Sequence, residues 1–148
     1  MKKLFYLVAL LAAATFTACG NKSEKANAVP AEITEFIASA DEELGAMNEN
    51  GMNYQGTALE DHDIVVTIGV DESMFYGMGM KAAFEMAGMT EDAFAQYMKA
   101  EMFSNMDEKD MKEVEVLREY KYNIVFRLVG SESGDQMNCK IGYDELPK

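Results

Sequence analysis

The sequence is poor in basic residues and has a single histidine, and these two shortages exclude several classes of function. Its 148 residues include 13 lysines and arginines against 26 aspartates and glutamates. Nucleic-acid backbones are bound by clustered lysines and arginines that displace counterions, so nucleic acid is excluded as a partner. With His62 as the only histidine and no Gly-x-Ser-x-Gly motif, no nucleophile is recognisably paired with a base. The composition therefore predicts a protein that is not an enzyme and needs no cofactor.

A hydrophobic run long enough to span a membrane is also missing. The longest apolar stretch, Leu4 to Phe16, has 13 residues, whereas a spanning helix needs about 20. It follows Lys2 and Lys3, and a short apolar segment behind positive charges is typical of a signal peptide. We therefore expect residues 1–18 to be removed, which leaves 11 basic and 26 acidic residues and a net charge of −15.

The segment that ends the apolar stretch, Phe16 to Gly20, reads Phe-Thr-Ala-Cys-Gly. Small residues before a cysteine at this position resemble the lipobox of bacterial lipoproteins. The resemblance implies cleavage before Cys19 by signal peptidase II and lipidation of Cys19. Several acyl chains on one residue anchor a protein stably, since a single chain is marginal. The expected location is a membrane of the bacterial cell envelope, at the periplasmic face of the outer membrane or at the cell surface. The alternative is an ordinary secretory signal with a chance cysteine.

Beyond a polar tether at residues 19–30, hydrophobic periodicity predicts one domain over 31–148. Apolar residues at helical spacing predict helices, and alternating residues predict strands. The expected helices are 31–46, 73–87 and one capped by Thr90; the expected strands are 52–59, 64–70, 114–128 and 137–143. This order, α-β-β-α-α-β-β, predicts an α+β fold with helices on one face of a roughly four-stranded antiparallel sheet. It resembles small domains of exported lipoproteins and, more loosely, cystatin-like or NTF2-like folds, without transferring an active site.

Methionine is abundant, with 13 in the chain. Met98, Met102 and Met106 recur at a spacing of four, which places their thioethers on one helix face. Such clusters resemble those of exported copper-handling proteins, because soft sulfur selects Cu(I). The same stripe includes Phe94 and Tyr97, which favours flexible packing in the core. A methionine-lined groove for an apolar ligand or peptide is the third interpretation.

Three further patterns are weaker signals. Gly77-x-Gly79-x-x-Ala82 has the letters of a dinucleotide fingerprint but lacks its position at the end of a strand. Carboxylates at Glu60 to Asp63, and again at 107–110, lack the spacing of a calcium loop and are expected to be solvated. Cys139 alternates with apolar residues, which predicts a buried free thiol rather than a nucleophile.

The strong negative charge is the remaining clue to a partner. It would steer the domain toward basic proteins, and exported lipoproteins that inhibit basic envelope-attacking enzymes share this charge and location. The alternative is that the acidity confers only solubility. We expect a lipid-anchored, non-enzymatic binding module whose partner is a basic protein, a peptide or an apolar ligand, with copper handling as an alternative.

Overall fold

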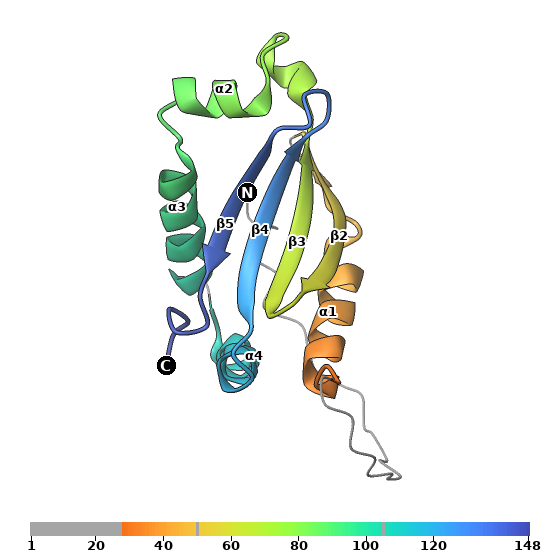
Figure 1. Ribbon diagram of the computed structural model, residues 1–148, viewed down its shortest axis with the longest axis vertical. Helices are drawn as coiled ribbons and strands as arrows, with labels where there is room; N and C mark the ends of the chain where they lie inside the picture. The colour runs from red at the N-terminus through yellow and green to blue at the C-terminus, as the bar shows by residue number, and fades with distance from the viewer. Residues whose placement is uncertain (1–27, 50, 105) are drawn as a thin grey trace.

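A computed structural model describes residues 28–49, 51–104 and 106–148. In these ranges the chain forms four α-helices, one 3-10 helix and a five-stranded sheet. The elements are α1 (Ala31–Leu44), β1 (Asn48–Glu49), β2 (Met52–Glu60), β3 (Asp63–Val70), η2 (Glu72–Phe75), α2 (Met80–Met86), α3 (Glu91–Ser104), α4 (Glu108–Glu119), β4 (Asn123–Gly130) and β5 (Gln136–Ile141) (Figure 1). The single α+β domain expected from the sequence is confirmed.

The sheet is mixed rather than wholly antiparallel. Its strand order is β1-β2-β3-β4-β5, and β3 pairs with β4 in parallel while the other neighbours are antiparallel. Between β3 and β4 the chain passes through α2, α3 and α4, and this long connection brings β4 back to the end at which β3 began. The expected four-stranded antiparallel sheet is therefore corrected to a mixed sheet, in which β1 adds a fifth strand of two residues.

The parallel pairing of β3 with β4 was not predicted because one predicted element was wrong. Alternating apolar residues predict one long strand over 114–128, but α4 continues to Glu119 and β4 begins only at Asn123. Val114 and Leu117 lie three residues apart on one helix face, and their exposed fractions are 1% and 0%. Leu117 breaks the alternation that a strand needs. Lys121, with φ of 58°, then turns the chain from the helix into β4.

The start of α4 corrects a second expectation. Asp107 and Asp110 cap the helix reciprocally: the Asp110 amide donates to Asp107 Oδ1 at 3.0 Å and the Asp107 amide donates to Asp110 Oδ2 at 2.8 Å. Asp110 is only 1% exposed, so it is not the solvated carboxylate that the sequence predicted. The acidic run at 107–110 is a helix start.

The helix predicted at 73–87 is also divided. Asp71 caps the short helix η2 by accepting a 3.0 Å hydrogen bond from the Ser73 amide. Tyr76 ends η2 in the left-handed region with φ of 54°, and α2 begins only at Met80. A single apolar segment therefore forms two short helices joined by a glycine-rich turn.

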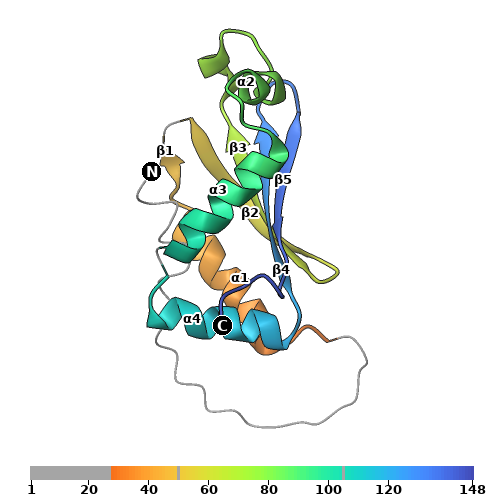
Figure 2. The same ribbon diagram turned by 90° about the vertical axis from the view of Figure 1, so that its left-hand side faces the viewer.

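The core lies between the sheet and the helices. Seen edge-on, α1, α3 and α4 cover one face of the sheet, and α2 lies beyond the ends of the strands (Figure 2). The packing of helices on one face is therefore as expected. The strands contribute alternate side chains to this core: Ile64, Val66, Ile68 and Val70 from β3, Ile124, Phe126 and Leu128 from β4, and Met137, Cys139 and Ile141 from β5.

Candidate functional site

The uncovered face of the sheet, which faces the viewer in Figure 1, carries a set of paired charges. Arg127 Nη1 and Nη2 donate to the two carboxylate oxygens of Glu60 at 2.8 and 2.9 Å, and Arg127 Nε donates to Asn138 Oδ1 at 3.2 Å. Glu60 is on β2 and Arg127 on β4, so the pair crosses β3 near Val65, which is only 1% exposed. The hydrogen bonds from Arg127 lower the pKa of Glu60.

Asp63, the second carboxylate of this face, is also held by the chain's own donors. Lys140 Nζ donates to both of its oxygens at 2.8 Å, and Asn123 Nδ2 donates at 2.6 Å. Burial raises the pKa of Asp63, but the hydrogen bonds from Lys140 and Asn123 outweigh it and the net pKa is lowered. The neighbouring His62 stacks on Tyr122, with ring centroids 5.1 Å apart. The segment 60–63 is solvated, as expected, with Glu60, Asp61 and His62 exposed and Asp63 half-buried, and Arg127 and Lys140 already neutralise its two strand carboxylates.

The most completely satisfied carboxylate is Glu72, which no sequence pattern singled out. Its side chain accepts from the Glu132 amide at 2.7 Å, the Ser133 amide at 2.6 Å, the Ser133 hydroxyl at 2.6 Å, and the Met80 amide. Glu72 is 2% exposed. Its partners in the β4–β5 turn are about sixty residues away in the chain, so no local motif could have revealed them.

These donors determine the ionisation of Glu72. The hydrogen bonds from Ser133 outweigh burial and, with those from Met80 and Glu132, lower the pKa of Glu72 to about 2. A carboxylate that is ionised and saturated at neutral pH cannot act as a general acid and has no free lone pair for a ligand. Glu72 therefore ties η2, α2 and the β4–β5 turn together.

The same contacts explain the glycine motif at 77–82. The Met80 amide at the start of α2 donates to Glu72, and the Lys81 amide donates to Asp135 Oδ2 at 3.2 Å. A Cβ on Gly79 would come within 2.8 Å of that Asp135 oxygen, so a larger residue there would displace the Asp135 carboxylate from the Lys81 amide. The amides that would bind a dinucleotide phosphate thus already donate to carboxylates of the chain. This arrangement does not favour a dinucleotide site at the glycine motif.

The methionine stripe lies largely within the core. Met98 is 4% exposed and Met102 is 7% exposed, and both pack among the residues that cover the sheet. Met106 is half-buried against the same core. This placement favours the packing interpretation over copper binding. Within the described ranges, no group of three or more histidine, cysteine or acidic side chains is arranged to hold a metal ion.

Cys139 is buried, as predicted, and is a free thiol. Its Sγ donates to the Ala95 carbonyl at 3.6 Å. Burial raises the pKa of Cys139 to about 11, which keeps the thiol protonated and unreactive at neutral pH. Cys19, the predicted site of lipidation, lies outside the described residues.

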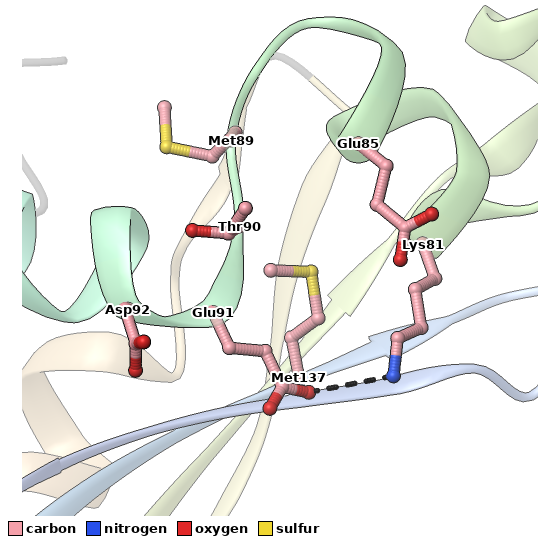
Figure 3. Close-up of a pocket in the computed structure, with 7 residues that line it drawn as sticks. All are labelled: Lys81, Glu85, Met89, Thr90, Glu91, Asp92 and Met137. Carbon is pink, nitrogen blue, oxygen red and sulfur yellow. Dashed lines mark ion pairs between the residues drawn. The ribbon is translucent and has the colours of Figure 1, made fainter.

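Two surface hollows are lined by described residues. One, of about 290 Å³, lies between α2, the start of α3 and β5, and is lined by Lys81, Glu85, Met89, Thr90, Glu91, Asp92 and Met137 (Figure 3). We call it the α2–α3 pocket. The other, of about 480 Å³, lies at the opposite end of β3, where residues 28–30 meet His62, Tyr120 and Tyr122. No sequence pattern predicts either hollow, because each combines segments that are distant in the chain.

The α2–α3 pocket differs chemically from the uncovered face. The Lys81 Nζ lies 3.7 Å from Glu91 Oε1, and the two side chains are 51% and 47% exposed. Met137 points up from β5 toward the centre of the pocket (Figure 3). Three carboxylates and one ammonium therefore surround an apolar floor, and the one ion pair among them is loose and hydrated.

Comparison with protein-family models, with curated proteins and with solved structures finds no match. Among the helices of the described ranges, none has the length and apolar character required to cross a membrane.

Proposed function

We propose that this protein is a lipid-anchored lipoprotein of the bacterial cell envelope that acts as a non-enzymatic interaction module. The observation that carries the proposal is the lipobox-like segment Phe16 to Gly20 behind a short apolar run. Two described side chains support a non-enzymatic role. Glu72 already accepts hydrogen bonds at both carboxylate oxygens, and Cys139 is buried and protonated at neutral pH. Neither is suited to catalysis.

The shape of the domain is compatible with presentation from a membrane. Residues 28–30, which lead back to Cys19, lie beside His62 at the start of β3. The η2 and α2 helices follow the other end of β3, whose eight residues span about 26 Å. The end that carries α2 is therefore far from residues 28–30 (Figure 1). Met74, Tyr76 and Met86 lie in this region and are exposed, by 52%, 100% and 77%, so apolar side chains at this end are accessible to a partner.

The anchor is tested by metabolic labelling with a palmitate analogue followed by separation of membranes. Wild type is expected to carry the label and to sediment with membranes, whereas Cys19→Ala should lose the label and become soluble. Cys139→Ala is the matched control, because its buried thiol should not be acylated and its removal should leave labelling unchanged. Retention of the label by Cys19→Ala would contradict the proposed anchor.

A further inference from the structure

The α2–α3 pocket has the size of one long side chain. Its volume of about 290 Å³ lies at the lower limit of ligand pockets, which are usually about 300–1,000 Å³. The walls come from α2, the following loop and the first turn of α3, and the floor comes from Met137 of β5 (Figure 3). A methionine floor accepts an aliphatic chain without demanding a fixed shape.

Charge decides which side chain fits. Glu85, Glu91 and Asp92 line the pocket, and Lys81 is the one basic residue among its lining. Glu91 already faces the Lys81 ammonium at 3.7 Å, so the chain itself places a cation there. A half-exposed pair at this distance contributes little stability and is readily exchanged. A second cation entering the pocket would meet an excess of negative charge, while its methylene stem would lie beside Met89 and above Met137, which is 2% exposed at the base of the pocket.

We infer that the α2–α3 pocket binds one lysine or arginine side chain of a partner polypeptide. The inference rests on the proposed function as an interaction module and names the chemistry of its partner. The negative charge of the whole chain, −13, would steer such a basic partner toward the domain. The pocket then supplies the local contact, by pairing the cationic head with carboxylates and the stem with methionine.

The binding is measured on the full chain, labelled with ¹³C at the methionine methyl groups and purified in detergent. The probe is acetyl-Gly-Arg-Gly-amide, and the control is the same peptide with neutral citrulline in place of arginine. The methyl resonances of Met89 and Met137 report directly on the pocket. We expect the arginine peptide to shift these two resonances in a saturable manner, and the citrulline peptide to leave them unchanged.

Two variants change the charge of the pocket, and a third serves as a control. Glu85→Gln combined with Asp92→Asn should weaken binding about fivefold, because two partially hydrated ionic contacts are lost. The matched control combines Glu35→Gln with Glu119→Gln, two exposed carboxylates of α1 and α4, and should bind like wild type. Lys81→Gln should tighten binding roughly threefold, since it removes the cation that competes for Glu91.

The result that overturns the inference is the absence of shifts at Met89 and Met137, or an equal loss of binding in both double variants. The second outcome would mean attraction by overall charge alone. The labelling of Cys19 is independent of this titration. A failed anchor with a functional pocket, and an intact anchor with an empty pocket, are therefore separate results.

Discussion

The uncovered face of the sheet and the α2–α3 pocket both contain carboxylates, but only those on the sheet are closely paired with cations of the same chain. On the sheet, Glu60 is paired with Arg127 through two hydrogen bonds and Asp63 is paired with Lys140 through two more. At the pocket, Glu91 meets Lys81 at 3.7 Å, and both side chains are about half exposed. The net charge of a protein therefore does not show where a cation from outside can bind. That depends on which carboxylates the chain has already neutralised.

Glu72 is the extreme case of a neutralised carboxylate, and changing it should have the largest effect. Glu72→Gln replaces one carboxylate oxygen by an NH2 group, which in either orientation faces a backbone amide that donates to Glu72, that of Met80 or those of Glu132 and Ser133. Buried donors without acceptors destabilise a fold, so we expect the melting temperature to fall by roughly 10 °C. Thermal unfolding followed by circular dichroism measures the change. An unchanged melting temperature would show that the carboxylate is not a structural tie.

The pH dependence of stability provides a second readout for Glu72. Its pKa is about 2 in the folded chain against an ordinary 4.5. A lowered pKa stabilises the fold fully above about pH 4.5, and this contribution is lost as the pH falls toward 2. Denaturant titrations at several acidic pH values should show a steeper loss of stability in wild type than in Glu72→Gln. Parallel curves for the two proteins would contradict the assignment.

Breaking the pair on the sheet should have a smaller effect. Arg127→Gln removes the cation that pairs with Glu60 and part of the side chain that lies over Val65. Because the ion pair is partly hydrated, its loss should cost little stability. We expect a loss of about 3 °C in melting temperature, and less difference from wild type at high salt. The pKa of Glu60, measured by carboxyl NMR, should return toward its ordinary value, because Arg127 is the main cause of its lowering. Lys112→Gln, an exposed change on α4, serves as the control.

Neutralising the pocket should have the smallest effect on stability. In Glu85→Gln combined with Asp92→Asn, relief of like-charge repulsion offsets the loss of an acidic residue at the amino end of α3. The melting temperature should stay within about 2 °C of wild type. A fall as large as that of Glu72→Gln would mean that the pocket carboxylates are structural, which would remove the contrast between the two regions.

Regular periodicity made much of the fold predictable. The helix expected at 31–46 is α1, the strand at 64–70 lies within β3, and Thr90 caps α3 by accepting a 3.2 Å hydrogen bond from the Ala93 amide. The error at α4 arose where helical and strand spacings overlap. Val114 and Val116 suit a strand, and only the buried Leu117 and the reciprocal Asp107–Asp110 cap favour a helix.

The sites were harder to predict because their parts are distant in the chain. The parallel pairing of β3 with β4 depended on recognising α4, and it brings Arg127 within reach of Glu60 across β3. The donors to Glu72 come from a turn about sixty residues later. The α2–α3 pocket likewise needs Met137 of β5 beneath residues of α2 and α3. Short-range sequence patterns do not reveal contacts between segments that are distant in the chain.

One measurement tests the contrast between the two regions directly. A cationic nitroxide and a neutral nitroxide of similar size are added in turn to the ¹⁵N-labelled full chain, and paramagnetic relaxation is measured at each amide. The ratio of the two effects reports the local attraction for a cation. We predict the highest ratio around Glu85, Glu91 and Asp92 and a clearly lower one around Glu60 and Asp63. An equal or higher ratio at the β2–β3 hairpin would contradict the view that the sheet carboxylates are already neutralised.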